Sequence, residues 1–205
     1  MLYSRPPFLM ALLPVKGGGC AACSKTPTST ASIFQSMTPH ALLIDETTGT
    51  VLLEKNATQP MVPSSMTKIL TVYMVFEALK AGTLKLTDKL PVIERARRIK
   101  GTKMFVKVGD WVSVEDLLRG IIVSSGNDAS VVIAEAFWGT EEAFAQMLTQ
   151  KAEELGATNN FFFNSTGLHV SGQSTTAHDL ASCPAYSAGF FHKIRPLLWT
   201  KRIFL

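Results

Sequence analysis

The segment at residues 63–68 contains a serine and a lysine three positions apart, Ser65 and Lys68. If a helix begins here, both side chains lie on one face of its first turn. A serine hydroxyl becomes an effective nucleophile when a base takes its proton, and a lysine serves as that base when burial lowers its pKa. A buried helix opening supplies this burial and offers unpaired N–H groups to charge on an attacked carbonyl. The pattern therefore predicts an acylation site, and the alternative is a capping serine beside a solvated lysine.

A second polar group, Ser-Ser-Gly-Asn-Asp-Ala at residues 124–129, joins two predicted helices at a glycine turn. The hydroxyl of Ser125 could pass a proton, and the carboxamide of Asn127 could bind a peptide-like substrate through both of its polar groups. Either residue could instead cap the helix that follows Gly126, and the two roles are compatible. These side chains form the second part of the predicted site.

The elements around the first polar group follow from hydrophobic patterning. Two apolar runs at residues 41–45 and 50–54 flank a polar loop that ends in Gly49, which predicts a β-hairpin. Residues 65–81 are apolar on almost every helical face, as in a buried helix, and Gly82 marks its end. The expected nucleophile and base therefore stand at the opening of a helix that the core surrounds.

The elements around the second polar group are a strand and several helices. Residues 104–108 predict a short strand followed by a turn at Gly109. Thr140 is the expected cap of one helix and Gly156 its end. The helical patterns occupy residues 112–123, 128–138 and 141–155, and another helix opens within residues 175–181.

The two polar groups, about 60 residues apart and in this order, are similar to motifs of the penicillin-recognising serine enzymes. The flanking residues narrow the resemblance to the D-alanyl-D-alanine carboxypeptidases, the low-molecular-mass penicillin-binding proteins of the DacA type. The resemblance runs from about His40 to Ala181 and rests on residues 40–45, 63–68, 104–110, 117–129 and 164–168.

This resemblance implies an α+β protein with the penicillin-binding-protein/β-lactamase-like transpeptidase fold, an antiparallel sheet flanked by helices beside an all-helical lobe. It makes Ser65 the acyl-enzyme nucleophile, with its N–H as half of an oxyanion hole, and Lys68 the general base. Ser125 would pass a proton to the leaving group, and Asn127 would hydrogen-bond the substrate's backbone. The resemblance implies no metal and no organic cofactor. The expected substrate is a peptidoglycan stem peptide ending in D-Ala-D-Ala, and β-lactams are the expected covalent inhibitors.

One motif of that family, Lys-Thr-Gly on a sheet strand, occurs nowhere in the sequence. It should follow Ala181, where the family's pattern stops and a basic, aromatic run without regular period begins. We therefore expect an incomplete fold that keeps the helical lobe and the N-terminal β-hairpin and lacks most of the sheet. A shifted reading frame or a truncated gene would explain the change. The expected organisation is a leader or disordered segment at 1–39, a partial carboxypeptidase domain at 40–181 and an aberrant basic tail at 182–205.

Composition excludes several other classes of protein. Of 205 residues, 46% are hydrophobic and 18% are charged, which argues against general disorder. All 16 acidic residues lie between Asp45 and Asp179, so the net charge of +4 comes from the two ends and argues against nucleic-acid binding. No apolar run approaches the roughly 18 residues of a spanning helix. Membrane association is left open.

The N-terminal segment predicts export, and the periplasm is the expected location. Arg5 precedes an apolar run at residues 8–15, and small residues follow it, which is the order of an export signal. Cys20 and Cys23 form a C-x-x-C, but no strand pattern and no further ligands accompany it, which disfavours a redox or zinc motif.

Three functions remain open from the sequence. The first is a serine-type D-alanyl-D-alanine carboxypeptidase whose activity the missing Lys-Thr-Gly motif puts in question. The second is a β-lactamase-like serine hydrolase, which would release a β-lactam quickly rather than hold it. The third is an inactive, non-catalytic remnant, which would also retain Ser65, Lys68, Ser125 and Asn127 after a recent truncation.

Overall fold

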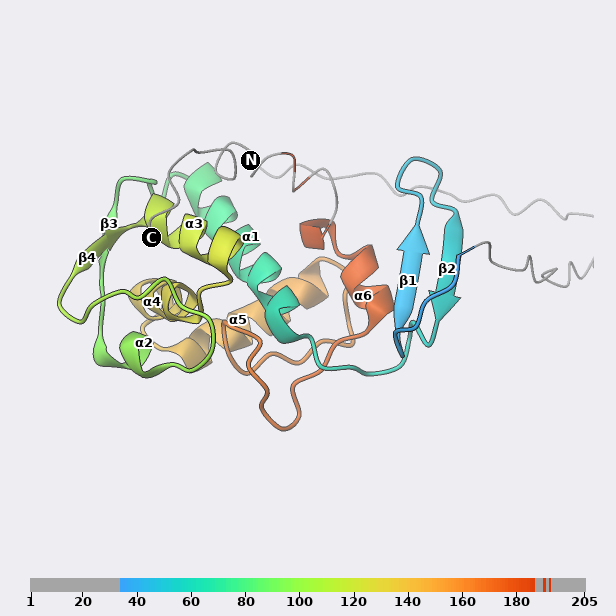
Figure 1. Cartoon of the computed structure of the whole chain (residues 1–205). Coiled ribbons are helices and arrows are strands. Elements are labelled where there is room, and N and C mark those ends of the chain that lie inside the picture. Colours follow the sequence, from blue (N-terminus) through green and yellow to red (C-terminus); the bar gives the residue numbers. More distant parts are fainter. Residues whose placement is uncertain (1–33, 187–189, 191, 193–205) are drawn as a thin grey trace, which may run out of the picture. The chain divides into compact units, whose positions relative to one another are not determined.

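The computed structural model describes residues 34–186, 190 and 192, and these form several helices and two pairs of short strands (Figure 1). None of the helices in this described part combines the length and hydrophobicity needed to cross a membrane. Of the expected leader at 1–39, the structure describes only residues 34–39. In chain order the elements are β1 (Ala41–Ile44), β2 (Val51–Lys55), the 3-10 turn η1 (Ser64–Met66), α1 (Thr67–Lys80), β3 (Lys89–Pro91), α2 (Glu94–Arg98), β4 (Trp111–Ser113), α3 (Val114–Ser124), α4 (Asn127–Trp138), α5 (Glu141–Glu154), α6 (Ala177–Ser182) and η2 (Pro184–Tyr186).

The predicted hairpin is present as the antiparallel pair β1–β2. Leu43 pairs with Leu53, and the register shifts immediately after Leu43. Gly49 closes the loop with φ +69°, a conformation that costs glycine little. A second antiparallel pair, β3–β4, forms a separate sheet. The described residues therefore contain two small sheets of two strands each, as expected of an incomplete fold.

The predicted strand at 104–108 is wrong. The N–H groups of Met104 and Val106 donate to the carboxylate of Asp128, at 2.9 and 3.2 Å, instead of to a neighbouring strand. Phe105 between them has φ +63°, which no strand residue adopts. The backbone N–H groups of this segment are therefore paired with a side-chain carboxylate and not with a neighbouring strand. The next strand, β4, begins only at Trp111.

Helix α1 is buried, as its all-round hydrophobicity predicts, because two clusters of the core meet on it. Val72 and Val75 pack with residues of α3 and α4, including Leu117 and Val131. The opposite side of α1 packs on α5 in a second cluster, whose buried members include Leu70, Met74, Phe144 and Leu148. Full burial of one such side chain contributes roughly 1.5–3 kcal/mol, so the core fixes α1 firmly.

The other helices follow their predicted caps closely. The side-chain oxygen of Thr140 accepts the N–H of Ala143 at 3.1 Å at the start of α5. Ser113 caps α3 in the same way, so this helix begins two residues later than its apolar pattern predicts. Gly126 precedes α4, as the glycine turn of the second polar group predicts.

The described residues beyond Ala181 pack against the body of the protein. Cys183 and Ala185 are buried in the second cluster. The ring of Phe190 lies 5.2 Å from that of Tyr73 and 5.8 Å from that of Phe76, both on α1. Residues 187–189, 191 and 193–205 of the expected basic tail at 182–205 lie outside the described residues.

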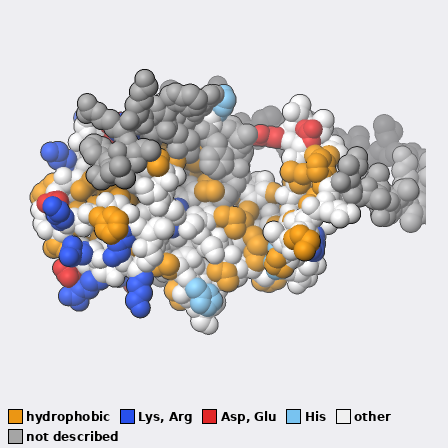
Figure 2. All heavy atoms as spheres, viewed as in Figure 1, with side chains coloured by type: hydrophobic (Ala, Val, Ile, Leu, Met, Phe, Trp, Pro, Cys, Tyr) orange, Lys and Arg blue, Asp and Glu red, His pale blue; other side chains and the backbone are white. Residues whose placement is uncertain are grey.

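Lysine and arginine side chains gather over α2 and the β3–β4 pair (Figure 2). Exposed members of this group are Lys85, Lys89, Arg95, Arg97, Arg98, Lys100 and Lys107. The nucleophile and base of the predicted site lie elsewhere, in the turn η1 and in the first turn of α1.

Candidate active site

Ser65 lies in the turn η1, immediately before α1, and is exposed. The preceding Ser64 has φ +49°, a left-handed conformation that non-glycine residues seldom adopt. One turn further on, Lys68 is only 4% exposed, and its Nζ donates to the Oγ of Ser65 at 3.2 Å. The sequence prediction that these two side chains share a helix face is confirmed.

Burial gives Lys68 the character of a base. Desolvation lowers the pKa of Lys68 to about 8, because the charged ammonium is less well solvated there than in water. Its Nζ also donates to the carbonyl oxygen of Thr166 at 2.7 Å, so the amine has a defined orientation. An amine with a pKa of about 8 is neutral in roughly one molecule in ten at pH 7, and in that form it can take a proton from Ser65.

Ser125 completes a row of three side chains. It ends α3 in the left-handed conformation, with φ +52° and ψ +36°, and its Oγ donates to the Oγ of Ser65 at 3.2 Å. The Oγ of Thr102 donates to the carbonyl of Ser125 at 2.6 Å and holds this turn in place. The structure therefore brings Ser125, Ser65 and Lys68 into hydrogen-bonding contact, although 60 residues separate the two serines.

Asn127 is part of the same turn but points inward. The residue is 2% exposed, and its Nδ2 donates to the carbonyl of Lys100 at 2.7 Å. Its buried Oδ1 accepts no hydrogen bond from the described residues. The expected two-sided contact of this amide with a substrate is therefore not prepared, because one side of the amide already serves the fold.

The loop at residues 164–168 is a part of the site that sequence reasoning missed. It supplies the carbonyl of Thr166, which fixes Lys68. Gly167 has φ +79°, and a Cβ there would overlap the carbonyl oxygen of Ser64. A glycine with an asparagine three positions before it and polar residues between them was the available signal for a tight turn. Nothing in the sequence indicated that this turn would close on the nucleophile.

An apolar cavity of about 250 Å³ opens beside the nucleophile. Its polar side consists of Ser65, Lys68 and Ser125. The rest of its described lining is apolar and comes from α1, α3 and the segment after Ala181: Ile69, Val72, Ile121, Ile122 and Phe190. No cluster of three or more metal-binding side chains occurs among residues 34–186, 190 and 192. The arrangement suits covalent attack by an activated serine on a carbonyl group.

Comparison with known proteins agrees with this arrangement. The family model for peptidase family S11, D-alanyl-D-alanine carboxypeptidase, matches residues 25–189, which extends past Ala181. D-alanyl-D-alanine carboxypeptidase DacF of Bacillus subtilis (strain 168) is 43% identical over 141 residues, which cover 69% of this chain and 36% of that protein. The chain thus spans about a third of the length of this relative.

Solved structures show the same fold. The D-alanyl-D-alanine carboxypeptidase DacD of Francisella tularensis superposes with a TM-score of 0.73 at 36% identity, over 80% of this chain and 39% of that one. Penicillin binding protein 6B of Escherichia coli gives 0.72 at 33% identity, over 86% and 58%. The chain has part of the penicillin-binding-protein transpeptidase fold, and it belongs to the D-alanyl-D-alanine carboxypeptidase family of serine peptidases.

Proposed function

We propose that this chain is a serine D-alanyl-D-alanine carboxypeptidase that acts on peptidoglycan stem peptides through an acyl-enzyme on Ser65. The observation that carries the proposal is the hydrogen-bonded row of Ser125, Ser65 and Lys68, with the pKa of Lys68 lowered to about 8 by burial. The family assignment supports the substrate class. Export to the periplasm, where such peptides are found, remains a proposal that rests on the first 39 residues.

The proposed acylation begins at the contact between Lys68 and Ser65. The neutral Nζ of Lys68 takes the hydroxyl proton as Oγ attacks the carbonyl carbon of the penultimate D-alanine. The N–H of Ser65 donates to the oxygen that becomes negative. As the C–N bond breaks, Ser125 gives its proton to the departing amine of the terminal D-alanine and receives the proton that Lys68 took, so Lys68 is neutral again for deacylation. An ester on Ser65 and a free D-alanine result.

Deacylation is the same chemistry with water as the nucleophile. Lys68 takes a proton from the water, the C–O bond of the ester breaks, and the proton returns to Ser65. A β-lactam would acylate Ser65 in the same way, but its leaving nitrogen stays tethered to the acyl group. Slow release of that adduct characterises a carboxypeptidase, and rapid release would favour the alternative of a β-lactamase-like hydrolase.

Substrate contact by Asn127 is part of this proposal in a narrower form than the sequence suggested. Its Nδ2 is engaged with Lys100, so the unpartnered Oδ1 is the atom left to accept an N–H from the substrate's backbone. Because Asn127 is buried, this contact requires the turn around it to open slightly. Even without the contact, Asn127 supports the turn that presents Ser125.

An inactive remnant is the second candidate, and the missing Lys-Thr-Gly motif favours it. The resemblance to the family assigns one oxyanion N–H and the contact with the substrate's terminal carboxylate to that motif's strand. Loss of one oxyanion donor typically costs ~10²–10³ in rate. The chain would then keep Ser65, Lys68 and Ser125 in contact, but Ser65 would not be acylated.

Intact mass after incubation with benzylpenicillin separates these candidates. We expect one penicillin adduct on the wild-type protein and none on Ser65→Ala. Ser64→Ala is the matched control, because it removes the neighbouring hydroxyl without touching the hydrogen-bonded row, and it should still be acylated. Absence of an adduct on wild-type protein that is folded by circular dichroism would reject the enzyme and leave the remnant.

A further inference from the structure

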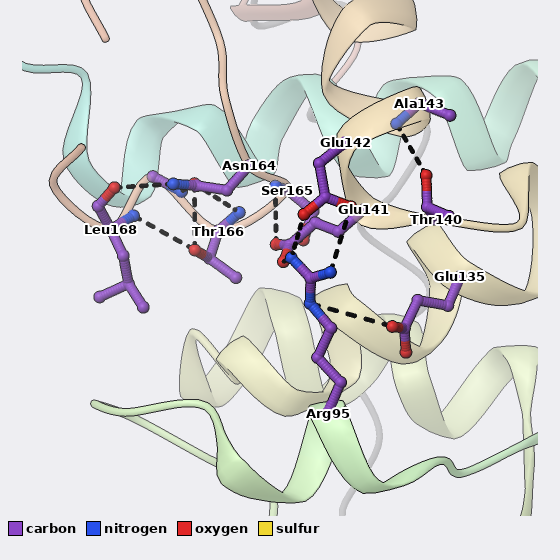
Figure 3. Close-up of polar contacts among 11 residues, drawn as sticks. Arg95, Glu135, Thr140, Glu141, Glu142, Ala143, Asn164, Ser165, Thr166 and Leu168 are labelled. Atoms are coloured by element: carbon purple, nitrogen blue, oxygen red, sulfur yellow. Dashed lines mark hydrogen bonds and ion pairs between the residues drawn. The ribbon is translucent and has the colours of Figure 1, made fainter. Parts of the chain in front are cut away.

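A buried glutamate connects the scaffold to the loop that holds Lys68. Glu141, the first residue of α5, is 2% exposed, and its Oε1 accepts both the N–H and the Oγ–H of Ser165, at 3.1 and 2.8 Å. Its Oε2 accepts from Nη2 of Arg95 on α2 at 3.0 Å (Figure 3). A carboxylate is costly to bury unless its oxygens are paired, and here both are. Each oxygen has a separate task, since one binds the loop and the other binds the arginine.

The loop at 164–168 is also hydrogen-bonded to α1 through two consecutive carbonyl groups. The carbonyl of Ser165 accepts the Oγ–H of Thr71 at 2.9 Å. The carbonyl of the next residue, Thr166, accepts from Nζ of Lys68 at 2.7 Å. Lys68 and Thr71 are three residues apart, so both contacts lie on one helix face. Any displacement of Ser165 therefore moves the oxygen that orients Lys68.

The remaining hydrogen bonds of the loop are mostly internal to it. Oδ1 of Asn164 accepts the N–H groups of Thr166 and Gly167, at 3.3 and 2.7 Å, and its Nδ2 donates to the carbonyl of Leu168 at 2.8 Å (Figure 3). These contacts shape the turn but do not attach it to α5. Glu141 supplies that attachment.

We propose that Glu141 is a positioning residue for the general base: by anchoring Ser165 it keeps the Thr166 carbonyl on Lys68 Nζ, and so keeps Lys68 against Ser65. The inference rests on the proposed acylation of Ser65. It adds a residue from the far side of the loop, which touches neither the nucleophile nor the base.

The neighbouring Glu142 provides a matched control. Both of its carboxylate oxygens accept from Arg95, at 2.7 and 3.1 Å, yet this side chain is largely exposed, and it makes no hydrogen bond to the described residues of the loop at 164–168. Glu141 and Glu142 therefore occupy neighbouring positions in the first turn of α5 and share an ion-pair partner, although only Glu141 is buried. They differ in the contact with Ser165.

The test compares benzylpenicillin acylation of four proteins: wild type, Glu141→Leu, Glu141→Gln and Glu142→Gln. Saturation kinetics separate the acylation rate constant from the dissociation constant of the preceding complex. We expect Glu141→Leu to lower the rate constant about 10–100-fold, as misplacement of a catalytic group does, with the dissociation constant within about twofold of wild type. Glu141→Gln keeps an acceptor oxygen for Ser165 and should stay within about threefold, as should Glu142→Gln.

Several results would overturn the proposal. The first is an acylation rate constant in Glu141→Leu that equals the wild-type value. The second is a loss of rate constant in Glu141→Gln as large as that in Glu141→Leu, because the effect would then come from the lost ion pair with Arg95 and not from the contact with Ser165. If Glu141→Leu is unfolded in a thermal melt, Ser165→Ala replaces it. That variant removes one of the two donors to Glu141 and should lose about three- to tenfold in the rate constant, whereas no loss contradicts the proposal.

A readout that needs no catalysis separates this inference from the proposed function. If the wild type forms no adduct, acylation fails as a function, and the position of Lys68 is followed instead by NMR titration of ¹⁵N-labelled lysine. We expect a wild-type midpoint near pH 8. In Glu141→Leu a looser loop should admit water and raise the midpoint toward 10.5, whereas Glu142→Gln should leave it unchanged. One common midpoint for all three proteins would refute the positioning role.

Discussion

The pH dependence of acylation gives a direct measure of what burial does to Lys68. Its pKa is lowered from 10.5 to about 8, and the cause is desolvation. At pH 7 a lysine of pKa about 8 is neutral in roughly one molecule in ten, whereas at 10.5 it would be neutral in roughly one in 3,000. Burial thus raises the population of the active base about 300-fold at this pH.

The lowered pKa of Lys68 determines how the acylation rate changes with pH. Because the neutral amine is the base, acylation should rise with pH and level off above the pKa. Between about pH 7 and pH 9 the neutral fraction grows about tenfold, with most of the gain below pH 8.5. Stopped-flow acylation with a chromogenic cephalosporin across this range should therefore give a sigmoid with its midpoint near 8.

Lys68→Arg supplies the control for this measurement. An arginine can still donate to the Thr166 carbonyl, but it stays charged throughout the range and cannot act as a base. It should abolish acylation at every pH tested. A rate that is flat with pH, or one that still rises tenfold per unit above about pH 9, would refute the assignment of Lys68 as the titrating base.

Three further substitutions, two of them with a control, test how the site and its helices are supported. Gly167→Ala should abolish acylation and lower stability by more than about 2 kcal/mol in a denaturant titration, because a Cβ would overlap backbone behind the nucleophile. Gly172→Ala, also at positive φ but with room for a Cβ, should cost only about 1 kcal/mol. Phe190→Ala should lower stability by about 3 kcal/mol because its ring packs on α1, whereas Phe105→Ala, 80% exposed, should change it by less than about 0.5 kcal/mol. Thr140→Ala removes the cap of α5 and should cost about 1 kcal/mol in the same titration.

The sequence predicted the elements whose signals are local. An apolar run on almost every helical face located α1, and the capping threonine at 140 located the start of α5, because both signals depend on residues within a few turns. The same holds for Ser65 and Lys68, which one helical turn brings together. The β1–β2 pair follows from two apolar runs and a glycine between them.

The features that the sequence did not predict all depend on contacts between distant residues. The segment at 104–108 has strand composition, but its N–H groups meet the carboxylate of Asp128, more than 20 residues away. No local pattern marks Thr166 as the partner of Lys68, because the contact is made by a backbone carbonyl, which every residue possesses. The sequence also contained no sign of the hydrogen bond between Ser165 and Glu141. A glutamate in the first turn of a helix is common, because it interacts favourably with the helix dipole, and nothing local marks it as a partner of a distant loop.

The hydrogen bond from Lys68 to Thr166 spans 98 residues of sequence, and this has a consequence for the order of folding. The first turn of α1 needs only its own neighbours, whereas this contact requires a loop of nearly the length of a small domain to close. A chain still emerging from the ribosome, with residue 166 not yet synthesised, carries a serine whose lysine is hydrated and protonated. Covalent labelling by penicillin would therefore report the completion of folding, because it would begin only after Thr166 had docked on Lys68.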